Sequence, residues 1–484
     1  MSKTYDMRSE PNNSIPRLGV ACAEQDQNGL SAGLRSDRKA VYYTIGATRI
    51  ATVTGVACLQ LWLASTLGPE PYGRFVVGYS AAWMLATLAI RGADSSTMRW
   101  VSASLAKRET GHDADLVAVA RRDAAITSLT ASALMGLAGL GLSRLLEQPD
   151  LGYVLLAASP LVALVSMTRV YEATARAVGM PLLGSVSSWL APWLVLGTLQ
   201  TRGILSGEGL TPAMVLLVQV VCYAGLAVTL RCVVGVSARV FFTPRYRDID
   251  EEAAYEARRQ SVPFILMAGA ITSQAHGMTL LAGACLGPAV AGQYGVAARL
   301  SALLLLGSEA AAVVAGPRFS AAHALGDRFR LQALARDTVL FSFSVAAIGS
   351  LVVFFAGHDL LALVGDAYTD AYTPLLILSA GALINASCGL VGLMLNMTGH
   401  AWVTLRGMLA GAGVGLTGVA LLAPALGLPG VCLGAAAGVV VWNATLSHAV
   451  WKRLGVISHL GSLVAKAQDQ ENSLASPFEA KGTA

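Results

Sequence analysis

Three arginines inside apolar stretches are the residues of this sequence best suited to chemistry: Arg49, Arg91 and Arg299. A guanidinium group is permanently charged, and its planar fork gives bidentate hydrogen bonds to phosphate oxygens. A charged side chain near the centre of a bilayer costs about 2.5–3.5 kcal/mol, so each one requires a compensating role. The three arginines therefore predict a binding site for an anionic group, with Arg49 and Arg91 at a cytoplasmic entrance and Arg299 near the midplane.

The depth of Arg299 is what distinguishes it. Its apolar segment is expected to begin at the outer surface near Ala289, so ten residues place Arg299 about 15 Å deep. Glu309 follows ten residues later, rotated by about 80° on a continuous helix, so that the two residues could border one cavity. Pairing of Arg299 with an acid for structural reasons is the alternative. Glu309 and His276 are also candidates for ion coupling or gating, as proton acceptors.

Other ionisable residues lie near the expected cytoplasmic ends of their segments, where a long side chain reaches the interface. Glu172 and Arg176 are four residues apart and can pair on one helix face, with Arg169 on the same segment. These residues are interpreted as structural.

The composition indicates a membrane protein. Of 484 residues, 55% are hydrophobic and 13% are charged, against about 25% charged in a soluble domain. This excludes a cytosolic enzyme, a nucleic-acid binder and a disulfide-stapled secreted module. Seven scattered cysteines form no Cys-x-x-Cys pair, and neither a metal-ligand cluster nor a nucleotide-binding loop is found, so no metal, no cofactor and no catalytic residue is expected.

The elements that must position these residues are twelve transmembrane helices, which make the expected fold all-α. The expected segments are 44–67, 74–94, 124–146, 152–171, 182–203, 212–235, 261–286, 289–315, 338–357, 372–397, 401–423 and 428–451. Arginine and lysine gather in the even-numbered loops and in the tail that opens with Lys452 and Arg453. Because cytoplasmic loops carry the excess of basic residues, both termini are predicted to be cytoplasmic.

The segments divide into two sets of six. The expected organisation is a disordered cytoplasmic tail (1–40), a first six-helix bundle (41–236), a cytoplasmic linker (237–260), a second six-helix bundle (261–451) and a second cytoplasmic tail (452–484). LGPEPYG (Leu67–Gly73) and LGPAVAGQYG (Leu286–Gly295) stand at equivalent places after the first helix of each set. This repetition predicts two bundles related as parallel repeats, with substrate bound between them.

The sequence also resembles the Wzx-type polysaccharide flippases of the multidrug/oligosaccharidyl-lipid/polysaccharide exporter superfamily. The resemblance rests on LG-x-x-x-YG before a basic internal loop, on LGPAVAGQYGVAARLSAL, and on VGDAYTDAYTPLLILSAGALINA (Val364–Ala386). It covers most of residues 40–450.

The resemblance implies a non-enzymatic transporter of the bacterial inner membrane. Such a protein flips undecaprenyl-diphosphate-linked oligosaccharide repeat units to the outer leaflet, by alternating access, for exopolysaccharide, O-antigen or capsule biosynthesis. Its expected partners are the anionic lipid-linked glycan, the lipid bilayer and polysaccharide polymerase or export machinery, with no nucleic acid.

Two other functions remain open from the sequence. A drug or cation antiporter of the same superfamily is disfavoured because such exporters usually place an acidic residue in an early helix, and the first segment has none. A membrane glycosyltransferase, such as a polysaccharide polymerase, would need a large external loop, and the longest expected external loop has about 14 residues.

Overall fold

The structure is a computed structural model that describes residues 30–107, 111–145, 149–180, 182–206, 209–237 and 251–460. The described residues from Ile45 onward form one compact unit. The helices are α1 (Leu30–Leu67), α2 (Pro69–Ala89), α3 (Ala93–Lys107), α4 (Gly111–Leu145), α5 (Pro149–Ala177), α6 (Val186–Ser206), α7 (Pro212–Ser237), α9 (Glu251–Thr272), α10 (Met278–Leu286), α11 (Pro288–Leu303), α12 (Leu306–Ala324), α13 (Arg328–Val364), α14 (Tyr372–Cys388), α15 (Val391–Met397), α16 (Ala401–Leu426) and α17 (Leu428–Leu454). Short turns of helix occupy Leu183–Ser185 (η1), Ser273–Gly277 (η2) and Asp366–Ala371 (η3).

Each of the predicted transmembrane segments corresponds to helix. Among the described residues, nine helical stretches are long and apolar enough to cross a bilayer, and the bent pairs α2–α3 and α11–α12 raise the number to 11. The remaining predicted segment, 182–203, is largely α6, which has 21 residues and contains Pro192. No strand occurs in the described ranges.

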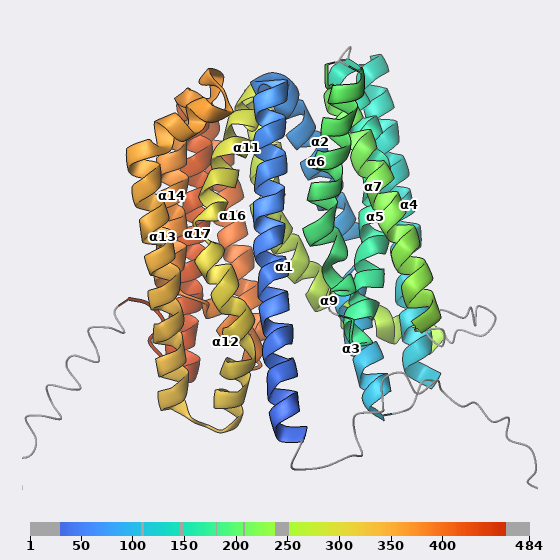
Figure 1. Ribbon diagram of the computed structural model, residues 1–484, viewed down its shortest axis with the longest axis vertical. Coiled ribbons are helices and arrows are strands. Elements are labelled where there is room, and N and C mark those ends of the chain that lie inside the picture. Colours follow the sequence, from blue (N-terminus) through green and yellow to red (C-terminus); the bar gives the residue numbers. More distant parts are fainter. Residues whose placement is uncertain are drawn as a thin grey trace, which may run out of the picture. The chain divides into compact units, whose positions relative to one another are not determined.

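The helices pack as two groups that follow the order of the chain. Helices α2 to α7 contact one another in the first bundle, and α10 to α17 do so in the second. In Figure 1, α4 to α7 lie together on one side and α13, α14, α16 and α17 on the other. Helix α9 forms the first part of the crossing that α10 completes. It packs against α2, α3 and α4 of the first bundle as well as against α16.

The two repeated turns have the same backbone conformation. Gly68 has φ 77° and ψ 172°, and Gly287 has φ 90° and ψ 171°. These positive φ angles suit glycine, and each glycine is followed by a proline at the first position of the next helix, where its missing N–H costs nothing. The sequence repeat is therefore also a structural repeat. We call the end of the unit that carries these two turns the predicted outer end.

A close contact between α2 and α11 joins the two bundles just below these turns. A Cβ atom on Gly73 would lie 1.7 Å from the carbonyl oxygen of Pro288, and one on Gly292 would lie 2.3 Å from that of Pro69. The two contacts are reciprocal, as expected for related halves. In the packing, Gly73 thus corresponds to Gly292. In the sequence motif, Gly73 corresponds instead to Gly295, which lies against the Tyr72 ring.

The hydrophobic core has a different arrangement at the two ends. One cluster includes residues of both bundles, such as Tyr72 and Leu216 of the first and Tyr368 and Val431 of the second. Toward the opposite, predicted inner end, each bundle has a separate cluster, around Trp100 in the first and around residues such as Phe319 and Leu446 in the second. One core cluster is therefore common to the two bundles, and toward the predicted inner end α9 also connects them through its contacts with α2, α3, α4 and α16.

Both α2 and α11 continue into a second helix after a bend. The α2–α3 pair bends by 44° and the α11–α12 pair by 49°. Arg91 and Gly92 have φ 52° and 69° at the first break. The second break separates Arg299 on α11 from Glu309 on α12, so the expectation that both lie on one continuous helix is wrong, and the 80° rotation does not apply.

Alanine at Gly73 or Gly292 is predicted to weaken the contact between the bundles. Because the added methyl group meets a backbone oxygen that cannot rotate away, stability should fall by about 1–3 kcal/mol. Thermal unfolding of the purified protein in detergent would measure this loss. Gly225→Ala on α7 is the control, since no atom lies within 4 Å of its added Cβ. Equal melting temperatures for all three variants would contradict the contact.

Candidate functional site

Arg299 lies on α11 beside groups from both bundles. It is half-buried, eleven residues beyond Pro288, which corresponds to about 16 Å along the helix. Its guanidinium lies within electrostatic range of four side chains, Tyr72, Tyr79, His276 and Tyr294. No carboxylate in the described part of the chain lies within the 4.0 Å of an ion pair with Arg299. The alternative, a structural pairing of Arg299 with an acid, is therefore not observed among the described residues.

A π-helical turn between α9 and α10 positions His276. The turn Ser273–Gly277 interrupts the regular hydrogen bonding of this crossing, an irregularity often found at functional sites. The His276 ring stacks on Trp83 with a centroid distance of 6.3 Å and an interplanar angle of 17°, and its Nδ1 lies 3.3 Å from Ser80 Oγ. His276 thus belongs to the region around Arg299, against α2 of the first bundle.

A row of aromatic rings follows one side of α2 through this region. Tyr72, Phe75, Tyr79 and Trp83 recur every three or four residues, and consecutive ring centroids lie 6.1, 5.7 and 5.8 Å apart. The Tyr72 hydroxyl donates to Gln60 Oε1 of α1 at 2.8 Å. The site is therefore a cation bordered by aromatic rings and hydroxyl groups, a combination suited to an anionic group carrying polar rings.

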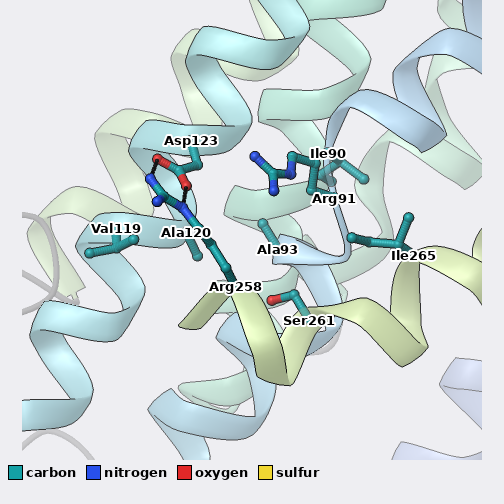
Figure 2. A pocket seen from close by; sticks show the side chains of 9 residues that line it. All are labelled: Ile90, Arg91, Ala93, Val119, Ala120, Asp123, Arg258, Ser261 and Ile265. Atoms are coloured by element: carbon teal, nitrogen blue, oxygen red, sulfur yellow. Dashed lines mark hydrogen bonds and ion pairs between the residues drawn. The ribbon is translucent and has the colours of Figure 1, made fainter. Parts of the chain in front are cut away.

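Arg91 lies in a second place, at the break between α2 and α3. Figure 2 shows it beside Asp123 of α4 and Arg258 of α9, around a cavity of about 20 Å³, which has room for a water molecule. Arg258 donates to Asp123 through Nε at 2.7 Å and Nη2 at 3.4 Å. The hydrogen bond and charge of Asp123 raise the pKa of Arg258 above its usual range. This pair joins α9 to the first bundle.

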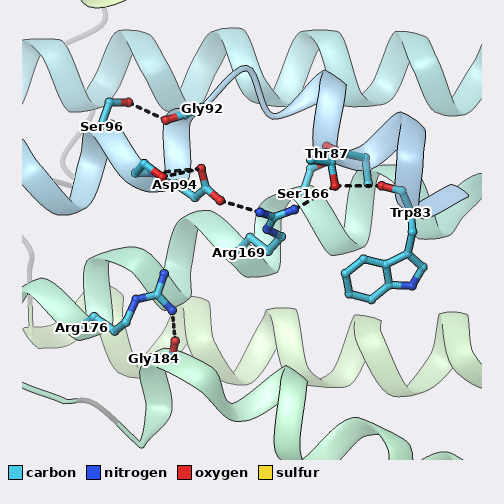
Figure 3. A network of polar contacts seen from close by, with 11 residues as sticks. Trp83, Thr87, Gly92, Asp94, Ser96, Ser166, Arg169, Arg176 and Gly184 are labelled. Atoms are coloured by element: carbon cyan, nitrogen blue, oxygen red, sulfur yellow. Dashed lines mark hydrogen bonds and ion pairs between the residues drawn. The ribbon is translucent and has the colours of Figure 1, made fainter. Parts of the chain in front are cut away.

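A network of polar contacts connects α2, α3 and α5 within the first bundle (Figure 3). Arg169 forms an ion pair with Asp94 at 2.8 Å and donates to Thr87 Oγ1 at 3.0 Å. Ser166 Oγ donates to the carbonyl of Ala86 at 3.0 Å. The network holds α3 at its angle to α2, because its members lie on both sides of the bend.

Glu172 has a different partner from the predicted one. Its Oε1 accepts hydrogen bonds from the backbone N–H and the hydroxyl of Ser187, at 2.7 and 2.8 Å. Arg176 donates to the carbonyl of Gly184. The expected pairing along one helix face is replaced by contacts to the turn before α6, and the assignment of these residues as structural stands.

The structure brings together some of the predicted site residues and separates others. Arg299 and His276 lie in one region, and Arg91 lies at the inner break. Glu309 is exposed on α12 beyond the second bend. Arg49 lies on α1, but its side chain is outside the described residues.

Two ion pairs between distant residues were missed from the sequence. The Asp123–Arg258 pair joins residues 135 positions apart, and the Asp94–Arg169 pair joins residues 75 apart. Local spacing contains no signal for either pair. The neighbouring Arg91-Gly92 could have indicated the first break, because glycine permits a left-handed backbone.

Loss of the Asp94–Arg169 pair is predicted to destabilise the first bundle. Because the two side chains are only 13% and 27% exposed, Asp94→Asn should cost about 1–3 kcal/mol. Asp337→Asn is the control, since Asp337 is 65% exposed in its pair with Arg336, and its loss should cost less than about 1 kcal/mol. Thermal unfolding in detergent would compare the two, and an equal cost would show that the network does not hold the bend.

No protein-family model and no curated protein matches the sequence of this chain. Solved structures match its fold. An inward-facing structure of a multidrug resistance MATE family transporter of the MOP superfamily superposes with a TM-score of 0.64 at 14% identity, over 88% of this chain and 99% of that one. An outward-facing structure from the same family has a TM-score of 0.57 at 16% identity, over 86% and 95% of the two chains.

A third similar structure is a MOP superfamily transporter from Pyrococcus furiosus, for which a binding pocket of reverse polarity is taken to suggest a different function. It has a TM-score of 0.57 at 16% identity, over 86% of this chain and 95% of that one. These likenesses confirm the predicted all-α membrane fold of twelve helices in two bundles related as repeats. The chain thus shares its fold with these MOP superfamily transporters.

Proposed function

We propose that this protein is a membrane transporter that flips an undecaprenyl-diphosphate-linked oligosaccharide from the cytoplasmic to the outer leaflet of a bacterial inner membrane. The observation that carries the proposal is the position of Arg299, deep in the unit and without a carboxylate partner in the described residues. A diphosphate and the half-buried guanidinium of Arg299 would offset each other's cost of desolvation by forming charge-assisted hydrogen bonds.

The surroundings of Arg299 suit the rest of such a ligand. Tyr79, Trp83 and His276 offer flat ring faces and polar edges within one region. Such side chains provide contact area with little loss of conformational entropy, together with hydrogen bonds for hydroxyl groups. Arg91, nearer the predicted inner end, would attract the anionic group on its way in, as would Arg49.

Alternating access fits the arrangement of the cores. One core cluster is common to both bundles, and each bundle has a further cluster of its own toward the predicted inner end. Similar folds are known in inward- and outward-facing states. In this proposal the ligand enters from the cytoplasmic side, where both termini lie. Polysaccharide polymerase or export machinery would receive the product.

The drug antiporter of the same superfamily is the second candidate, and the fold of the multidrug transporters favours it. A cationic drug calls for a carboxylate, whereas the charge in this region is an arginine. The reverse-polarity pocket of the Pyrococcus furiosus transporter supports the idea that this fold accommodates such a change.

Arg299→Gln is predicted to abolish flipping with little effect on folding. The protein would be reconstituted in liposomes with a fluorescent undecaprenyl-diphosphate-linked oligosaccharide, and a membrane-impermeant quencher would measure its transfer. We expect a loss of at least about tenfold, because the neutral amide provides neither the charge nor the fork. Arg299→Lys should recover only part of the rate.

Arg406→Gln is the matched control, because Arg406 is exposed on α16 and should not affect transfer. Full transfer by Arg299→Gln would contradict the proposal. Transport of a cationic dye with none of the lipid-linked glycan would favour the antiporter.

A disulfide between the bundles is predicted to stop transport, because it would hold the protein in the conformation described here. A Cβ atom on Gly283 of α10 would lie 4.0 Å from Cβ of Val77 on α2, within the range of about 3.5–4.5 Å for disulfides. Val77→Cys with Gly283→Cys should therefore cross-link on oxidation, block flipping, and regain activity when a reductant is added.

Gly136→Cys with Ser159→Cys is the control for this experiment. These positions have a Cβ separation of 3.7 Å, but both lie in the first bundle, on α4 and α5. Their disulfide should leave transport unchanged. Continued flipping by the protein with an oxidised Val77→Cys/Gly283→Cys pair would show that transport does not require relative movement of the two bundles at this contact.

A further inference from the structure

A cavity at the predicted inner end of the second bundle is separate from the region around Arg299. It has a volume of about 220 Å³ and is lined by residues of α12, α13 and α17, among them His323, Arg328 and Arg453. A water molecule needs only about 10–15 Å³ by this measure. The cavity therefore has room for a larger polar group.

The cavity lies where three membrane crossings end. The apolar stretches finish at Ala324 in α12 and at Leu454 in α17, and the α13 stretch begins at Arg328. Gly326, with φ 67°, permits the tight turn that brings α12 and α13 together. Arg453 lies two residues after the expected end of its transmembrane segment at residue 451, so the cavity is predicted to lie near the inner membrane surface, where lipid headgroups are found.

The charge of the cavity favours an anion. Arg328 and Arg453 converge on it from two helices, and neither forms an ion pair with the described residues. The one carboxylate in the lining, Asp327, has its Oδ1 engaged by the backbone N–H of Arg330 at 2.9 Å. Two guanidinium groups thus remain available to the same ligand.

The surface beside the cavity is apolar. Leu325 is 72% exposed, Phe329 is 92% exposed and Trp451 is 59% exposed. Large apolar side chains next to basic ones are typical of a membrane interface, where the apolar groups contact acyl chains and the cations contact phosphates. A soluble phosphate would use only the cations.

We propose that this cavity is a binding site for the phosphate headgroup of an anionic membrane lipid. Arg328 and Arg453 bind the phosphate oxygens, His323 provides a further hydrogen bond, and Leu325 and Phe329 contact the acyl chains. Because the site holds α12, α13 and α17 together at their inner ends, the bound lipid stabilises the second bundle.

The test uses the full chain in detergent, with lipid binding followed by native mass spectrometry and by thermal unfolding. Dioleoylphosphatidylglycerol is expected to bind about tenfold more tightly than dioleoylphosphatidylcholine and to raise the melting temperature. The double variant Arg328→Gln/Arg453→Gln should lose this preference, with unchanged binding of phosphatidylcholine. Arg328→Lys/Arg453→Lys should retain most of it, because the charge remains.

Arg330→Gln/Lys452→Gln is the matched control, since it removes two neighbouring charges of the same surface that do not line the cavity. It should keep the preference for phosphatidylglycerol. Equal losses in both double variants, or no preference in the unmodified protein, would overturn the site. Glycerol 3-phosphate should not replace the lipid; stabilisation by it to the same extent would overturn the assignment to a lipid.

Discussion

The carbonyl oxygens of Pro69 and Pro288 occupy the space that a side chain at Gly292 or Gly73 would need. This reciprocal contact brings the backbones of α2 and α11 together, and the position of the site depends on it. The aromatic row of α2 and Arg299 of α11 face the same region because these two helices touch. In a membrane, where water does not drive helices together, such close approach through small residues is a main source of association.

Polar groups inside the unit fall into two kinds. Asp94 with Arg169, and Glu172 with Ser187, are satisfied by partners within one bundle, so their desolvation is offset locally. Arg299 borders both bundles and has tyrosines and a histidine around it instead of a carboxylate. In the proposed function, the charge of Arg299 is compensated by the ligand, whereas the charges of Asp94 and Arg169 are compensated within the fold.

The sequence was sufficient for the fold and for part of the site. Apolar runs and basic loops identified all twelve segments, because a helix that crosses hydrocarbon must be both long and apolar. Arg299 and His276 were found because ionisable residues in such segments are few. The bend at Leu304 and the π-helical turn at Ser273 were not found, since they depend on packing between segments. The bend at Arg91 was missed although the neighbouring Gly92 permits it. For the same reason, Glu309 was placed with Arg299 on an uninterrupted helix, although a bend separates them.

The two halves bend at unequal depths, although each begins with the same repeated turn. Helix α2 has 21 residues before its break and α11 has 16, whereas the segments beyond the breaks have 15 residues in α3 and 19 in α12. The second half therefore has the longer helix beyond its bend, and that bend lies close to Arg299. For the same change of angle, the tip of α12 travels farther than the tip of α3, so a symmetric hinge motion would open an asymmetric passage.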